Sequence, residues 1–105
     1  MKFILTILLF LIPLNLDYNQ NKIKVFQINS KWNRQNSLDL SNLRNCEVDF
    51  GWYEDQPEEF TSVFKKVPVI IIFSNKKPVY KWEADISFKL NLAIDEVQAK
   101  VNNLK

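Results

Sequence analysis

Several residue types on which enzymes commonly depend are missing or nearly missing from this sequence of 105 residues. The chain has no histidine, which excludes histidine-based acid–base catalysis, histidine metal ligands and histidine pH switches. It has one cysteine, Cys46, so an internal disulfide, a redox dithiol and a cysteine-rich zinc site are excluded. It has one glycine, Gly51, so glycine-rich phosphate-binding loops are excluded as well. We therefore expect no metal site and no cofactor.

The charge of the chain is nearly balanced. Its 14 basic and 12 acidic residues give a net charge of +2, which is too small for a protein dedicated to nucleic acid. Hydrophobic residues make up 47% of the chain and charged residues 25%, as in a single packed globular domain. Lysine and asparagine are abundant while arginine occurs only at positions 34 and 44, a usage that often reflects an AT-rich genome of a phage or a bacterium.

An apolar run, FILTILLFLIPLNL, occupies residues 3–16. A lysine ahead of such a run is typical of a secretory signal peptide or an uncleaved membrane anchor, although no small-residue cleavage site follows. The run is short for a membrane span, which needs about 20 apolar residues, and Pro13 argues against an uninterrupted helix. The alternatives are a strand or helix packed on the domain, or a segment inserted in a partner or virion membrane. We expect an exported or membrane-associated protein if residues 1–16 act as a leader, and a cytoplasmic or virion protein otherwise.

The polar residues 17–21 are expected to be a linker, and residues 22–105 are expected to be the folded domain. Apolar residues in alternation or in an unbroken run predict strands over 22–29, 47–53, 69–73 and 78–83.

Helical spacing and helix-start residues predict three helices. These cover residues 34–44, a short segment that begins at Pro57 after a cap at Asp55 or Gln56, and residues 94–104. The first two strands are joined through a helix and should run parallel, while the last two should form an antiparallel hairpin. The sequence thus predicts an α/β domain with a mixed sheet and helices on both faces.

This order of elements resembles the thioredoxin-like superfamily. Val67 and Pro68 precede the apolar run VIIIF, and in thioredoxins a proline at this place is in the cis conformation. The segment Glu54-Asp55-Gln56-Pro57 resembles the thioredoxin segment after the preceding strand. The resemblance covers most of residues 23–104 and implies a thioredoxin-like mixed sheet flanked by helices on both faces.

The sequence departs from this family at the redox site. Thioredoxins carry Trp-Cys-x-x-Cys after the first parallel strand, and here the corresponding residues are Trp32, Asn33, Arg34, Gln35 and Asn36. The chemistry needs a thiolate nucleophile and a second thiol to resolve the mixed disulfide, and an amide side chain replaces neither. Dithiol oxidoreductase activity is therefore excluded.

Two interpretations of the degenerate site stay open. In the first, Asn33 is the N-cap of a helix and replaces the interaction of the lost thiolate, while Pro68 fixes the entrance of a strand. In the second, Trp32, Asn33 and Arg34 form a peptide-binding surface with the loop before Pro68, whose backbone groups are free to pair with an extended peptide. We expect Trp32 to be exposed, and Cys46 to be a small buried apolar residue.

The function expected from these observations is a non-catalytic domain that binds a protein or an extended peptide, or that serves as a structural module. An accessory or virion component of a virus or phage is one setting for it. The first alternative is a thioredoxin-fold enzyme that uses Cys46 alone or no thiol. The second is a membrane-tethered scaffold in which residues 1–16 are the functional element.

Overall fold

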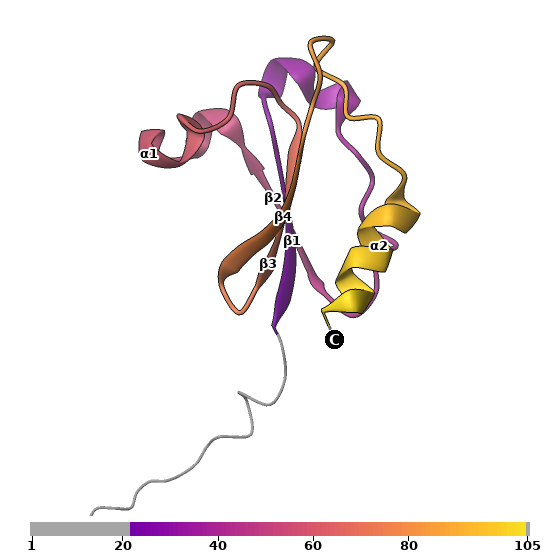
Figure 1. Ribbon diagram of the computed structural model, residues 1–105. Coiled ribbons are helices and arrows are strands. Elements are labelled where there is room, and N and C mark those ends of the chain that lie inside the picture. The colour runs from indigo at the N-terminus through magenta and orange to yellow at the C-terminus, as the bar shows by residue number, and fades with distance from the viewer. Residues whose placement is uncertain (1–21, 105) are drawn as a thin grey trace, which may run out of the picture.

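The computed structural model describes residues 22–104, which form a β-sheet with helices on both sides (Figure 1). The predicted leader of residues 1–16 and linker of residues 17–21 lie outside these described residues. No helix within residues 22–104 is long and apolar enough to cross a membrane. The elements are, in chain order, strand β1 (Ile23–Asn29), 3-10 helix η3 (Lys31–Asn36), strand β2 (Glu47–Trp52), 3-10 helix η4 (Tyr53–Asp55), helix α1 (Glu58–Thr61), strands β3 (Val69–Ser74) and β4 (Lys77–Glu83), and helix α2 (Ile94–Asn103).

The sheet is mixed, with the strand order β2-β1-β3-β4. β1 and β2 run parallel, with Val25 opposite Val48, whereas β3 runs antiparallel to both β1 and β4. The turn between β3 and β4 consists of Asn75 and Lys76, whose φ angles of 53° and 73° suit the primed turns of tight hairpins. The prediction of a mixed sheet with a parallel first pair and a C-terminal hairpin is confirmed.

Each face of the sheet has its own hydrophobic core. Figure 1 shows α2 on one side of the sheet and α1 on the other, with β1 and β3 in the centre. Both central strands bury side chains on both faces, as their nearly continuous apolar sequences require. The buried core residues are Ile23, Val25, Leu40, Ile70, Ile72, Val97 and Val101 on the α2 side, and Ile28, Phe64, Val67, Val69 and Ile71 on the α1 side.

The predicted helix over residues 34–44 is wrong. Helix η3 ends at Asn36, and Ser37 is already extended, with φ −65° and ψ 145°. The helix is interrupted by Gln27 of β1. Its side chain lies on the α2 side of the sheet and is 2% exposed. Its amide donates to the carbonyl of Leu38 and accepts from the N–H of Leu38, both at 2.8 Å. Because these bonds use both backbone groups of Leu38, they compete with a helical turn at that position.

Residues 37–46 instead cover part of the sheet as a loop that is fastened to α2. The side chain of Gln98 accepts from the N–H of Arg44 and donates to the carbonyl of Arg44, both at 2.9 Å. Leu40, a residue of this loop, is buried in the core on the α2 side of the sheet. Val48 and Phe50 of β2, which point to the same side of the sheet as this loop, remain 42% and 41% exposed.

Helix α1 has four residues and does not begin as predicted. Pro57 occupies the N-cap position, and no side chain caps the helix. The prediction that Asp55 or Gln56 is the cap is wrong, because Asp55 belongs to η4 and the Gln56 amide donates to the carbonyl of Trp52 at 3.1 Å.

Candidate functional site

A buried network of amide side chains lies where β1 ends and η3 begins, and Asn33 is its centre. Asn33 is 3% exposed. Its amide nitrogen lies 3.1 Å from Oδ1 of Asn29, 3.2 Å from the carbonyl oxygen of Val67 and 3.0 Å from that of Phe88. Its Oδ1 accepts a hydrogen bond of 2.7 Å from the amide of Asn36. One side chain therefore joins β1, η3, the segment before β3 and the loop after β4.

Asn29, the last residue of β1, extends the network. It is completely buried, and its amide donates to the carbonyl of Asn33 at 2.9 Å and to the hydroxyl of Ser37 at 2.8 Å. Its Oδ1 also accepts from the N–H of Ser30 at 2.9 Å. Among the described residues, no buried side-chain nitrogen or oxygen atom lacks a partner. A fully satisfied network of this kind holds the segments that it joins in one arrangement.

The interpretation of Asn33 as a helix N-cap is wrong. Ser30 is the residue that precedes η3, and Asn33 lies inside the helix with non-helical angles of φ −109° and ψ 18°. This local break in the helix turns the Asn33 side chain toward β1 and the Val67 carbonyl. The side chain connects separate segments and does not satisfy the N–H groups at the start of its own helix.

The Val67–Pro68 peptide bond is cis, the isomer that the resemblance implied, and both residues are buried. The hydrogen bond from Asn33 places this loop directly beside η3, as expected. The carbonyl of Val67, one of the backbone groups expected to be free for a peptide, already accepts a hydrogen bond of 3.2 Å from the Asn33 amide. The carbonyl of Pro68 likewise accepts the N–H of Ala84 at 3.1 Å.

A pair of aromatic rings, one exposed and one partly buried, lies next to this network. Trp32 is 63% exposed, as predicted. Its ring lies edge-on to the ring of Phe88, with the centroids 5.0 Å apart and an interplanar angle of 76°. A pocket of about 180 Å³ opens here, and we call it the aromatic pocket. Its lining residues are Ser30, Trp32, Tyr53, Lys65, Lys66, Val67 and Phe88.

Phe88 has an unusual backbone conformation. Its φ of 60° lies in the left-handed region, which is uncommon for a residue other than glycine and is unfavourable for a bulky one. Hydrogen bonds hold it there from both sides, since its N–H donates to the carbonyl of Asp85 at 3.0 Å and its carbonyl accepts from Asn33. Outliers of this kind persist where the surrounding structure enforces them, and they cluster at functional sites.

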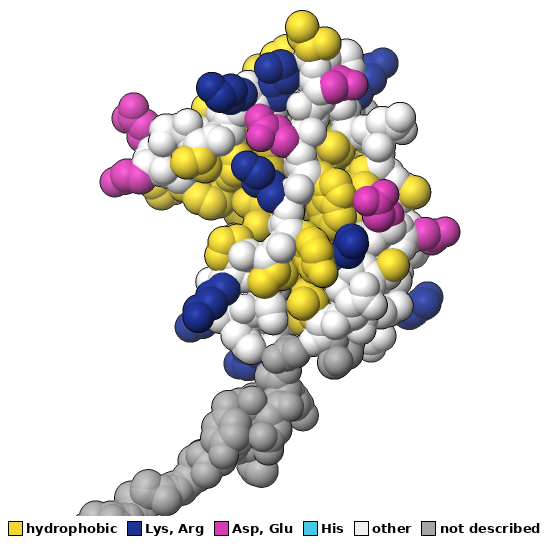
Figure 2. Space-filling view, in the orientation of Figure 1, with side chains coloured by type: hydrophobic (Ala, Val, Ile, Leu, Met, Phe, Trp, Pro, Cys, Tyr) yellow, Lys and Arg dark blue, Asp and Glu magenta, His cyan; other side chains and the backbone are white. Residues whose placement is uncertain are grey.

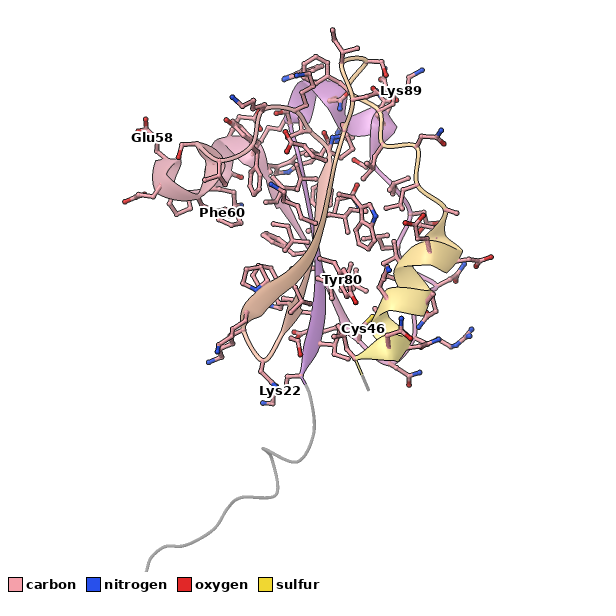
Figure 3. All side chains as sticks on the ribbon, in the orientation of Figure 1. Lys22, Cys46, Glu58, Phe60, Tyr80 and Lys89 are labelled. Atoms are coloured by element: carbon pink, nitrogen blue, oxygen red, sulfur yellow. The ribbon has the colours of Figure 1, made fainter. Side chains whose placement is uncertain are left out.

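Basic residues surround the aromatic pocket. Lys65 and Lys66 line it, and the backbone N–H groups of both donate to the carboxylate of Glu83 at 2.8 and 3.1 Å. Arg34 is exposed on the neighbouring helix η3, as is Gln35. Figure 2 shows Lys and Arg side chains at this end of the molecule, with Asp and Glu side chains between them, and Figure 3 places Lys89 there. The surface around the aromatic rings thus carries several positive charges.

Two carboxylates near the pocket are held in their ionised form by hydrogen bonds. The pKa of Glu54 lies below its ordinary value because its own backbone N–H and then the N–H of Lys31 donate to it. The pKa of Asp85 is lowered by the hydroxyl of Ser87 and next by the N–H of Ser87. Both carboxylates help to fix loops at the rim of the pocket.

Cys46 lies far from the aromatic pocket. Figure 3 shows it at the opposite end of the sheet from Lys89, near the end of α2. It is partly buried and packs against the core on the α2 side. It supplies no group to the pocket. Within residues 22–104, no three His, Cys, Asp or Glu side chains gather in a group that could hold a metal ion.

Sequence reasoning missed several residues of the site. Asn29 carried a usable signal, because an amide inside a strand of otherwise core-forming pattern needs a buried partner. Phe88 carried none, since it lies in a segment without helical or strand periodicity. No protein-family model matches the chain, and no curated protein matches it.

Proposed function

We propose that this chain is a thioredoxin-like domain without redox chemistry, and that it binds an extended segment of a partner protein at the aromatic pocket. The strand order β2-β1-β3-β4 and the cis bond at the entrance of β3 support the first part of the proposal. The observation that carries the second part is Trp32, a large and 63% exposed ring held on a rigid base.

The base is rigid because its polar groups are all engaged. Asn33 and Asn36 stand where a redox protein of this family has its cysteines, and their mutual hydrogen bond of 2.7 Å connects the two positions without sulfur. The other bonds of Asn33 connect η3 to the loops on either side of it. A surface that is already ordered loses little conformational entropy when a partner binds.

Recognition at this surface depends on side chains. A peptide that pairs with the backbone before Pro68 needs free carbonyl groups, and the carbonyls of Val67 and Pro68 are already bonded within the domain. The rings of Trp32, Tyr53 and Phe88 remain available at the pocket. Tryptophan and tyrosine are enriched among the residues that dominate binding energy at protein interfaces. The pocket therefore suits an apolar side chain of the partner.

The alternative functions have less support from the described residues. An enzyme that uses Cys46 would act at the end of the sheet opposite the aromatic pocket and the amide network. A membrane tether at residues 1–16 is compatible with peptide binding, and it stays a prediction.

Peptide display tests the proposal. The immobilised full-length chain is panned against a library of random peptides, and the affinities of enriched peptides are measured by isothermal titration calorimetry. We expect Trp32→Ala to weaken binding by a factor of about thirty or more, which corresponds to about 2 kcal/mol for a central aromatic contact. Phe88→Ala should also weaken it.

Val63→Ala is the matched control, because Val63 is 60% exposed, nearly as much as Trp32, but does not line the pocket. Its affinity should equal that of the wild type. Enriched peptides that bind the Trp32→Ala variant as tightly as the wild type would contradict the proposal.

A further inference from the structure

The two edges of the sheet differ in how they are protected against pairing with another strand. The edge strand β4 contains Lys77, Pro78 and Lys81, and its pairing with β3 is interrupted by a register shift next to Phe73. Prolines, lysines and irregular pairing are the features with which proteins block the addition of strands to a sheet edge. The other edge strand, β2, has the sequence EVDFGW and contains neither proline nor lysine.

The β2 edge also exposes apolar surface. Val48, Phe50 and Trp52 lie opposite Val25, Gln27 and Asn29 of β1, so all three point to the α2 side. Val48 and Phe50 are 42% and 41% exposed, and the rings of Phe50 and Trp52 meet edge-on at 4.9 Å. The loop of residues 37–46, which replaces the predicted helix, leaves this strip uncovered.

We infer that two copies of this chain associate by antiparallel pairing of their β2 strands, with the two-fold axis at Phe50. In this register Phe50 faces Phe50 of the second copy, and Val48 faces Trp52 of the second copy. Directly opposed apolar and aromatic side chains are favourable cross-strand pairs. The exposed strip of each copy is then covered by the strip of the other, and the two sheets become one.

The charges on β2 select this register. Asp49 and Gly51 point to the α1 side, and with the axis at Phe50 the carboxylate of Asp49 faces Gly51 of the second copy. An axis at Asp49 would instead bring the two Asp49 carboxylates face to face, which is destabilising. On this side of the strand Gly51 is covered by the side-chain amide of Gln56 and the ring of Phe26. The ion pair between Lys24 and Asp49, at 3.6 Å, further offsets the charge at this position.

The edge has a backbone donor ready for the second strand. The N–H of Phe50 donates to the carboxylate of its neighbour Asp49 at 3.0 Å. In the pairing that we infer, this N–H donates to the carbonyl of Phe50 in the second copy, and Asp49 keeps Lys24. Because Phe50 lies on the axis, the same exchange takes place twice, once from each copy.

Sedimentation equilibrium of the full-length chain tests this inference. Every sample contains the same detergent, so that residues 1–21 meet the same surroundings in each variant. The solvent density is matched to that of the detergent, so that the measured mass is that of the protein. We expect the wild type to have the mass of a dimer. Phe50→Lys should raise the dimer dissociation constant at least tenfold, because it places two ammonium groups face to face. Val79→Lys is the matched control, since Val79 is 42% exposed on the other edge strand and should leave the dimer unchanged.

Cross-linking checks the register. Opposed residues of a hydrogen-bonded antiparallel pair have Cα atoms about 5.5 Å apart, which is within the range that a disulfide spans. In a Cys46→Ala background, Phe50→Cys should therefore give a covalent dimer when copper phenanthroline oxidises the two thiols, and Val79→Cys should not. A monomeric wild type would overturn the inference. A dimer that persists unchanged in Phe50→Lys, or that is lost in Val79→Lys, would also overturn it. Either result would indicate that the chain associates through the apolar run of residues 3–16, or that β2 pairs with a strand of another protein.

Discussion

Asn36 donates a hydrogen bond of 2.7 Å to the side chain of Asn33, across the same separation in sequence at which thioredoxins form their redox disulfide. In the thioredoxin-like arrangement that we propose, the two amides stand at the positions of the redox cysteines but have a different chemistry. A disulfide at this place forms and breaks with the redox state of its surroundings, whereas an amide–amide hydrogen bond does not respond to it. The second turn of η3 is consequently held in one state, together with the three other segments that Asn33 connects.

We expect Asn33→Ala to be the most destabilising substitution in the amide network. It leaves the carbonyls of Val67 and Phe88 and the amide of Asn36 without their present partner. Because an unsatisfied buried group costs about 1–3 kcal/mol, the free energy of unfolding should fall by about 3 kcal/mol or more. Urea denaturation followed by circular dichroism measures the change. Asn91→Ala, at an exposed position, should change the same quantity by less than about 0.5 kcal/mol. Equal effects of the two substitutions would show that the network does not stabilise the fold.

The wild-type chain should not reduce insulin disulfides, with dithiothreitol or with a thioredoxin reductase system as electron donor. Asn33 and Asn36 supply neither a nucleophile nor a resolving group, and Cys46 lies at the opposite end of the sheet. The turbidity assay for insulin reduction measures this, with a thioredoxin as positive control. Turnover above the rate of the donor alone would place redox chemistry at Cys46, and a Cys46→Ala variant would then abolish it.

Acidification should loosen the loop that carries Phe88. The folded-state pKa of Asp85 is lowered, chiefly by the Ser87 hydroxyl, so its stabilising effect is complete above the ordinary value and is lost as the pH falls through the lowered value. The accessibility of Trp32 should therefore be constant from neutral pH to about pH 5 and rise below about pH 4. Acrylamide quenching of a chain with Trp52→Phe and Trp82→Phe measures it.

A matched pair of variants isolates the contribution of this carboxylate. Asp85→Ala should raise the quenching of Trp32 at neutral pH. Asp39→Ala should not, although Asp39 makes the same kind of bonds to Ser41 and its pKa is lowered in the same way. Identical quenching in the two variants would mean that Asp85 does not position Phe88.

Residues 22–105 should fold without the apolar run of residues 1–16. Among residues 22–104, the cores on both sides of the sheet are built from residues between Ile23 and Val101, and we expect these residues to suffice for folding. Circular dichroism of this fragment should show a cooperative thermal melt. Large apolar side chains contribute about 1.5–3 kcal/mol each when buried. An unfolded or aggregated fragment beside a soluble full-length chain would therefore mean that the run belongs to the fold.

The strands could be predicted closely from the sequence, because alternation and the unbroken run of residues 69–73 report directly on which faces are buried. The same reasoning was wrong about residues 34–44. There the spacing of Leu38, Leu40 and Leu43 admitted a helix, and the decisive influence came from Gln27, which is distant in sequence. When a side chain bonds to the backbone of another segment, the hydrophobic periodicity of that segment gives no sign of the interaction.

The candidate site shows the same limit. The positions of Trp32, Asn33 and Val67 were predicted as neighbours, and the exposure of Trp32 was predicted correctly. The role of Asn33 was not predicted correctly. Helix capping depends on neighbouring residues in the sequence, whereas the four side-chain contacts of Asn33 come from segments up to 55 residues away. Phe88 could be found only from the structure, since its importance lies in its contact with Trp32 and in its left-handed backbone.

The paired hydrogen bonds between Gln98 and Arg44 have a consequence for how this domain opens. They attach the loop of residues 37–46 to a helix near the C-terminus, 54 residues further along the chain. We therefore expect the loop and α2 to open together, so that their amide protons exchange with solvent at similar rates. A protease or a truncation that detaches α2 should therefore also release the loop. The α2-side face of β2, where Val48 and Phe50 are already partly exposed, would then be uncovered further.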